Sequence, residues 1–318
     1  MIDWTVAAAG LVVGLIVGLT GMGGGALMTP ILVLFFGVPP LTAVSNDLVV
    51  SALMKPVGGW VHIRRRTVNW PLVGWLCVGS VPAAFAGVLL TRAVGGDLQS
   101  LVKTALGVTL VLAATLIGVK QWLARRRGPV TGEIVVRPLR TVLIGVVGGL
   151  VVGMTSVGSG SLVVVALLVV YPALAANRLV GTDLVQAVPM VAAAAGGHLL
   201  FGDFHLELTL SLLVGSIPGV WVGARFSSRA KGGTIRAFLA VILLASGLKM
   251  LSVPNEAVVA AVAATALGIG AGYLHQRRRA ARTVALMPDP VAGVEQAPHT
   301  PTLVSSGSAR ERDAVPVE

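Results

Sequence analysis

Residues 18–27 read GLTGMGGGAL and separate two strongly apolar runs, Val6–Leu19 and Leu27–Phe36. Four of the five residues 21–25 are glycine. Each glycine inside a helix costs about 1 kcal/mol relative to alanine, so this stretch predicts that a helix breaks here. The pattern returns at residues 153–162, which read GMTSVGSGSL, and the two copies together decide the fold.

The chain repeats itself beyond the two glycine-rich stretches. Residues that are rare in apolar segments recur in the same order in both halves. The interval between the glycine loop and the aspartate is one residue longer in the second half. The matched pairs include Thr20 with Thr155, Gly23 with Gly158, Gly25 with Gly160, Asp47 with Asp183, His62 with His198, Ser80 with Ser216, and Pro82 with Pro218. Apolar bias alone would rarely align such residues, so the sequence indicates an internal duplication.

The composition of the chain is that of a membrane protein. Of its 318 residues, 55% are hydrophobic and 12% charged, and the mean hydropathy is +0.88. Soluble domains carry roughly 25% charged residues. Several apolar runs approach the roughly 20 residues that cross a bilayer as a helix, and they are too continuous for alternating barrel strands. We therefore expect an all-α polytopic membrane protein in contact with the lipid bilayer.

The net charge of +11 does not indicate nucleic-acid binding. The basic residues cluster between apolar runs, as at Arg64–Arg66, Arg125–Arg127 and Arg277–Arg279. Short loops rich in Lys and Arg remain in the cytoplasm, so these clusters predict how the chain is oriented in the cell membrane. A basic face with interleaved polar and aromatic residues is missing, so we expect no nucleic-acid partner.

The sign of the loop charge reverses between the two halves. Arg64–Arg66 follow His62, whereas the corresponding loop after His198 carries Asp203 and Glu207 and no Lys or Arg. Two repeats related by an axis in the membrane plane produce such a reversal. We therefore expect two inverted repeats, each with a glycine-rich helix that is broken or re-entrant near mid-membrane.

The apolar runs and charge clusters divide the chain into five parts. We expect a first membrane repeat at residues 1–123, a basic cytoplasmic linker at 124–138, a second repeat at 139–251, an additional transmembrane helix at 252–276, and a basic, then disordered, cytoplasmic tail at 277–318. The expected segments are Trp4–Leu19, Leu27–Gly37, Ala43–Ile63, Trp70–Thr91, Leu98–Leu123, Leu139–Met154, Leu162–Tyr171, Leu179–Leu200, Leu206–Arg225, Ile235–Leu251 and Ala257–Tyr273. The second segment of each half is short, so the number of crossings is left between about eight and eleven.

Both glycine-rich loops are expected to bind an anion. A broken helix frees backbone N–H groups, the next helix N-terminus carries about half a positive charge, and glycine lets a ligand approach the backbone. The expected substrate-binding residues are Thr20, Gly21, Gly23, Gly24, Gly25, Ser45, Asn46, Thr155, Ser156, Gly158, Ser159, Gly160, Ser161 and Thr182. The alternative is that the glycines only allow close helix packing, although crowded glycines suit that role less well than glycines four residues apart.

Three charged residues fall within the expected membrane segments. Asp47 and Asp183 are candidates to carry protons, and the alternative is that they cap the N-termini of their helices. Lys55 has no counterpart in the second half and is a candidate counter-charge for an anion or a partner for Asp47, unless its side chain snorkels to the membrane surface. No catalytic triad, carboxylate pair or metal cluster is recognisable, so we expect no enzyme, no metal and no cofactor.

These motifs resemble the TauE/SafE family of membrane permeases, also called the sulfite exporter family. The resemblance rests on the doubled glycine loop, the SND and GTD stretches at 45–47 and 181–183, and the GSxPxxxxG segments at 79–87 and 215–223. It extends from about Val6 to Leu251 and implies a permease for small sulfur-containing anions such as sulfite, sulfoacetate and related sulfonates. The second loop departs from the first, because Ser156 and Ser159 replace Gly21 and Gly24.

Two other classes of function remain open at this point. An anion channel would have the same fold without alternating access, and a membrane component that transports nothing would also fit the composition. The sequence does not separate a carrier from a channel, and it leaves a homo-oligomer open.

Overall fold

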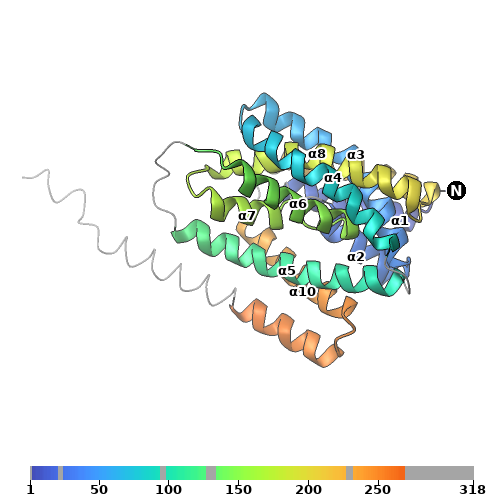
Figure 1. Cartoon of the computed structure of the whole chain (residues 1–318). Coiled ribbons are helices and arrows are strands. Elements are labelled where there is room, and N and C mark those ends of the chain that lie inside the picture. Colours follow the sequence, from blue (N-terminus) through green and yellow to red (C-terminus); the bar gives the residue numbers. More distant parts are fainter. Residues whose placement is uncertain (1, 21–23, 94–97, 127–133, 227–231, 269–318) are drawn as a thin grey trace, which may run out of the picture. The chain divides into compact units, whose positions relative to one another are not determined.

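The structure, a computed structural model, describes residues 2–20, 24–93, 98–126, 134–226 and 232–268. Within these residues every regular element is a helix (Figure 1). The helices are α1 (Trp4–Thr20), α2 (Gly25–Phe35), α3 (Pro40–Arg64), α4 (Trp70–Ala93), α5 (Leu98–Arg126), α6 (Pro138–Thr155), α7 (Leu162–Val170), α8 (Ala176–Phe201), α9 (Leu206–Phe226), α10 (Gly232–Met250) and a further helix at Asn255–Gly268. The first ten begin and end within about three residues of the expected segments, which confirms the all-helical fold.

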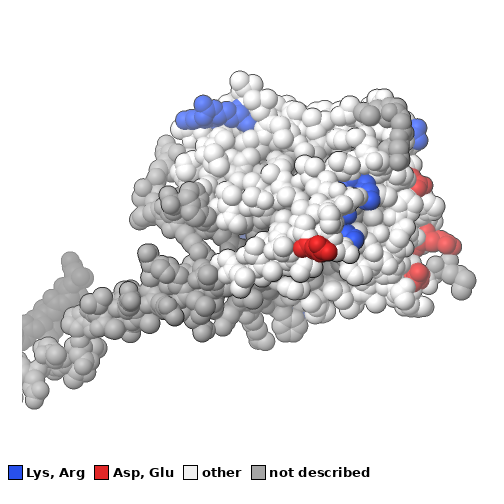
Figure 2. Space-filling model, turned by 90° about the horizontal axis from the view of Figure 1, so that it is seen from below, with Lys and Arg blue, Asp and Glu red and all other residues white. Residues whose placement is uncertain are grey.

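Several helices and the exposed surface are suited to a bilayer. Five helices, namely α4, α5, α6, α8 and α9, are long and apolar enough to cross a membrane. Large apolar side chains also point outward, among them Trp4, Trp221 and Phe238, which are 72%, 64% and 59% exposed. On the face shown in Figure 2, most of the described surface is uncharged, and most of the charged side chains gather toward one end. The protein is therefore a multi-pass membrane protein.

The main helix pairs join the two halves of the sequence. α1 packs mainly on α9, and α6 packs mainly on α4. A Cβ atom on Gly14 would lie 2.4 Å from the carbonyl oxygen of Ser216, and one on Gly149 would lie 2.4 Å from that of Ser80. Such backbone contacts through small residues are typical of membrane helices. Gly14 matches Gly149 in the repeat, as Ser216 matches Ser80, so the duplication extends to the helix packing.

Corresponding helices of the two halves also lie side by side, and they run antiparallel. The Ser45 hydroxyl near the start of α3 bonds Nδ1 of His198 near the end of α8, at 2.8 Å. Gly59 near the end of α3 lies against Val185 near the start of α8. α5 and α10 pair in the same way, with the start of α5 beside the end of α10.

The short helix α7 folds back along α6, so that the two ends of this hairpin meet. The hydroxyl of Tyr171, the residue after α7, lies 2.5 Å from the hydroxyl of Thr141 in the first turn of α6. The same Tyr171 oxygen accepts the backbone N–H of Arg137 at 2.9 Å. The chain therefore enters α6 and leaves α7 at the same end of the bundle.

The hairpin of α1 and α2 is arranged in the same way. α1 begins beside the start of α9, where the backbone N–H of Asp3 donates to the Ser211 hydroxyl at 2.9 Å. The start of α3, which follows α2, lies beside the same part of α9, because the Thr209 hydroxyl donates to Oδ1 of Asn46 at 2.7 Å. Both hairpins thus begin and end near one end of the bundle.

Candidate functional site

The second glycine-rich loop breaks the helix as the sequence predicts. α6 ends at Thr155, and α7 begins at Leu162. The loop that joins the two helices has positive φ values at Ser156 (59°), Gly158 (132°) and Gly160 (92°). Residues other than glycine rarely adopt such values. The Thr155 hydroxyl accepts the backbone N–H of Val157 at 3.2 Å, so this predicted substrate residue also shapes the loop.

Ser161, another predicted substrate residue, stands at the N-cap of α7. Its hydroxyl makes no capping hydrogen bond, although its carbonyl oxygen accepts the N–H of Val165 at 3.0 Å. The side chain is 7% exposed. Its hydroxyl therefore lies buried beside the N-terminus of α7, where backbone N–H groups have no partner in the helix.

The first glycine-rich loop is described in part. Gly21 and Gly23 lie outside the described residues, as does the side chain of Thr20. Gly24 has ordinary helical φ and ψ angles of −60° and −30° and precedes α2. Gly25 touches the second loop, because a Cβ atom on it would lie only 2.1 Å from the carbonyl oxygen of Ser156. The structure therefore brings the two loops together.

Lys55 lies where α3 meets the second loop. Its Nζ donates to the Ser159 hydroxyl at 2.7 Å, and the residue is only 6% exposed. Lys55 also interacts electrostatically with both Asp47 and Asp183. A snorkelling lysine would have its amine in water, so that alternative is wrong. Lys55 instead bonds to the loop, and its charge acts on both buried carboxylates.

Asp47 is fully buried and has its own hydroxyl partners. Thr29 on α2 donates to Oδ2 at 2.8 Å, and Ser51, one turn along α3, lies 3.5 Å from Oδ1. The Ser156 hydroxyl also lies close to Asp47, but its oxygen is buried and meets no hydrogen-bond geometry. Asp47 thus connects α2 and α3 beside the second loop.

Asp183 occupies the matching position on α8 with fewer partners. The backbone of Gly160 hydrogen-bonds to it, and it interacts electrostatically with Lys55. Its Oδ1 is buried without a hydrogen-bond partner, and so is Oε1 of Gln186 one turn further along α8. Nε2 of Gln186 donates to the Ser80 hydroxyl on α4 at 2.6 Å. We missed Gln186 at the sequence level, although a lone glutamine near Asp183 in an apolar helix was a usable signal.

The expectation that the two aspartates cap their helices is wrong. α3 begins at Pro40 with Pro39 as its N-cap, and α8 begins at Ala176 with Ala175 as its N-cap. Asp47 and Asp183 therefore lie about two helical turns inside their helices. Pro40 starts α3 early because proline has the φ value of a first helical residue and needs no N–H partner there.

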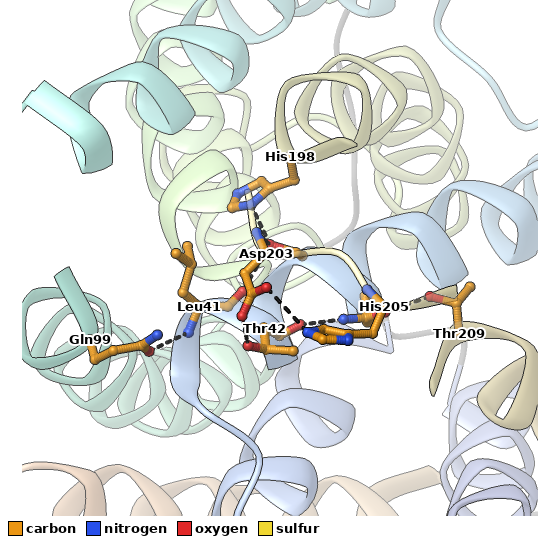
Figure 3. Close-up of polar contacts among 9 residues, drawn as sticks. Leu41, Thr42, Gln99, His198, Asp203, His205 and Thr209 are labelled. Carbon is orange, nitrogen blue, oxygen red and sulfur yellow. Dashed lines mark hydrogen bonds and ion pairs between the residues drawn. The ribbon is translucent and has the colours of Figure 1, made fainter. Parts of the chain in front are cut away.

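Ser45 and Asn46 bond to groups at the end of the bundle near Asp203, away from Lys55. The Ser45 hydroxyl contacts Nδ1 of His198, and Oδ1 of Asn46 accepts the N–H of His205 at 3.2 Å. In this cluster the Thr42 hydroxyl donates to Asp203, and Nε2 of His205 lies 3.2 Å from Oδ1 of Asp203 (Figure 3). Ser45 lies about 15 Å from Lys55 along the helix axis, at 1.5 Å per residue.

Thr182 has the corresponding role on the other half. Its hydroxyl accepts the backbone N–H of Asn69, just before α4, at 3.0 Å. The equivalent bond is the one from His205, just before α9, to Asn46. Asn46 and Thr182 thus each hold a loop of the opposite half. Their contribution to substrate binding stays a prediction.

No group of three His, Cys, Asp or Glu side chains in the described part of the chain could hold a metal ion. The contacts described above define the candidate site. It consists of Lys55, Ser159 and the two touching loops, with the buried carboxylates of Asp47 and Asp183 near Lys55. A buried ammonium, hydroxyls and helix N-termini are groups that bind an anion.

The sequence matches the family described as Sulfite exporter TauE/SafE over residues 6–250. The chain belongs to the TauE/SafE family. Relatives from Bacillus subtilis (strain 168) have similar descriptions. The probable membrane transporter protein YjnA is 40% identical over 250 residues, which cover 76% of this chain and 97% of the relative.

Two more distant relatives also have transporter names. The probable membrane transporter protein YdhB is 25% identical over 240 residues, covering 75% of this chain and 96% of the relative. The probable membrane transporter protein YunE is 34% identical over 93 residues, covering 29% and 33%. No solved structure matches this TauE/SafE chain significantly. The family and these names indicate a membrane transporter, which is consistent with the expectation that the chain is not an enzyme.

Proposed function

We propose that this TauE/SafE protein is a permease that moves a small anion, sulfite or an organosulfonate, across the cytoplasmic membrane by alternating access. The observation that carries the proposal is the hydrogen bond from the buried Lys55 to Ser159, 2.7 Å long, at the point where the two glycine loops touch. The sulfur oxyanion is suggested by the family description.

The loops and the lysine offer complementary donors to such an anion. The ammonium group of Lys55 has three N–H donors, one of which goes to Ser159. The N-termini of α2 and α7 follow the two loops and add partial positive charge. A small oxyanion with several acceptor oxygens can use these donors together.

The helix packing supports alternating access between two inverted repeats. Corresponding helices run antiparallel in both the α3–α8 and the α5–α10 pairs, as an axis in the membrane plane requires. Each glycine-rich hairpin begins and ends near one end of the bundle. We propose that these hairpins are re-entrant and that α3, α4 and α5, with their counterparts α8, α9 and α10, cross the membrane.

The proposed orientation places the C-terminus and the basic segments in the cytoplasm. With Cys77 replaced by serine, Asp203→Cys should react with a membrane-impermeant maleimide added outside intact cells, and Arg65→Cys should not. The reason is that Lys and Arg in short loops remain inside. Arg65 is exposed, and the side chain of Asp203 is 43% exposed. Labelling of position 65 from outside, with position 203 protected, would reverse the orientation.

A counterflow experiment tests the function itself. We expect proteoliposomes containing the purified protein to take up labelled sulfite or methanesulfonate faster when the same unlabelled anion is inside. The reason is that the binding site of a carrier reorients across the membrane faster with bound substrate than when it is empty. An anion channel would give no such acceleration. Empty liposomes give the background, and flux at background level for both anions would refute the proposed function.

A further inference from the structure

We propose that Asp183 binds the proton that accompanies the transported anion and shares it with Gln186, while Asp47 stays ionised as the counter-charge of Lys55. This inference rests on the proposed function. It separates the roles of two aspartates that occupy equivalent positions in the repeat.

The first step is the charge balance around Lys55. One ammonium group interacts with two carboxylates, Asp47 and Asp183, and all three residues are at least nine-tenths buried. With both carboxylates ionised, the group has a net charge of −1 and repels an anion in a site of low dielectric constant. Neutralising one carboxylate removes this repulsion. An anion therefore binds best together with one proton.

The second step is the difference in hydroxyl partners. Asp47 receives the Thr29 hydroxyl at 2.8 Å and faces the Ser51 hydroxyl at 3.5 Å. In the second half, the positions matching Thr29 and Ser51 are Val164 and Ala187, which have no hydroxyl. Asp183 thus lacks the side-chain donors that stabilise an ionised carboxylate, and it is the one of the pair suited to hold a proton.

The third step is a pair of buried acceptors without a donor. Oδ1 of Asp183 and Oε1 of Gln186 have no hydrogen-bond partner, and the residues are 3% and 0% exposed. Residues three apart share one face of a helix, and the bond from Nε2 of Gln186 to Ser80 leaves Oε1 as the free end of the amide. A carboxylate only accepts hydrogen bonds, whereas a protonated carboxyl also donates one. A single proton on Asp183 therefore provides the donor that Gln186 lacks.

Other charged groups around Asp183 are compatible with this role. Lys55 on α3 and Lys120 on α5 interact with it electrostatically, and the Gly160 backbone donates to it. His62 on α3 lies against Gly181 near the start of α8. The two lysines oppose protonation, and an anion bound at Lys55 offsets their charge. Proton and anion binding thus favour each other, as coupled transport requires.

Proteoliposomes with an imposed pH difference test the coupling. The probe is labelled methanesulfonate, which stays ionised across the pH range used. If one proton moves with each anion, a difference of one pH unit, acid outside, should drive up to about tenfold accumulation. Asp183→Asn should abolish the accumulation and make counterflow independent of pH. Gln186→Leu should reduce the accumulation, and Glu256→Gln on an exposed helix is the control for loss of a carboxylate.

Infrared difference spectra between acid and alkaline pH provide a readout that does not require transport. In the unaltered protein we expect a C=O band from a protonated carboxyl group. This band should disappear in Asp183→Asn, shift in Gln186→Leu and persist in Asp47→Asn. A band that persists in Asp183→Asn and disappears in Asp47→Asn would overturn the assignment.

The transport outcomes separate this inference from the proposed function. Counterflow without pH-driven accumulation would refute the coupling to a proton, while the proposed permease function would still hold. Accumulation driven by a sodium gradient and not by pH would also overturn it. No counterflow of methanesulfonate or sulfite would refute both.

Discussion

Replacing Lys55 by methionine is expected to reduce sulfite or methanesulfonate counterflow at least about 100-fold. The side chain of methionine fills similar space but has no charge and no N–H donor. It also removes the positive charge that acts on the buried carboxylates of Asp47 and Asp183, and an uncompensated buried charge destabilises a folded protein. We also expect a lower unfolding temperature, measured in detergent by tryptophan fluorescence.

Three further variants make this result interpretable. Lys55→Arg keeps the charge but has a planar fork in place of the compact ammonium that bonds Ser159, so we expect intermediate flux. The double change of Lys55→Met with Asp47→Asn should recover stability without recovering flux. Lys249→Met, at an exposed lysine near the end of α10, should behave as wild type. Normal counterflow through a stable Lys55→Met protein would exclude Lys55 from the anion site.

The neighbouring glycines Gly24 and Gly25 should respond to alanine in opposite ways. Gly25→Ala is expected to abolish transport and destabilise the protein, because its Cβ would lie 2.1 Å from the backbone oxygen of Ser156. Overpacking of this kind typically lowers the free energy of unfolding by about 1–3 kcal/mol. Gly24→Ala should be tolerated, since Gly24 has helical angles and its Cβ would approach no atom closer than 3.8 Å.

Gly158 completes this comparison for a different physical reason. A Cβ atom there meets only side-chain atoms at 3.4 Å, but φ is +132°, so Gly158→Val is expected to abolish transport through backbone strain. Counterflow and thermal unfolding of the three purified variants check these effects together. Equal behaviour of Gly24→Ala and Gly25→Ala would mean that contact between the loops does not control transport.

The helices could be predicted from the sequence, and most of the site's contacts could not. Apolar runs bounded by charged or glycine-rich segments gave the helix positions, because helix length and hydropathy are local properties. The bond from Lys55 to Ser159 joins residues 104 positions apart, and only the packing of α3 against the second loop creates it. No local pattern contains that information.

The aspartates illustrate how a local rule can mislead. The polar residues before Asp47 and Asp183 suggested helix starts, but Ser45, Asn46 and Thr182 bond to the opposite half of the chain. Small polar residues serve such bonds between helices as well as caps. Thr29 was missed because an isolated threonine in an apolar run acquires meaning only from its neighbours in space.

The pairing of α1 with α9 has a consequence for synthesis at the ribosome. The contact between Asp3 and Ser211 joins residues 208 positions apart. At about 5–20 residues per second, translation reaches the second partner roughly 10–40 s after the first. During that time the glycine face of α1 lacks the helix that it packs on in the finished protein. The nascent first half therefore needs a temporary neighbour, lipid or an insertion factor, until the second half arrives.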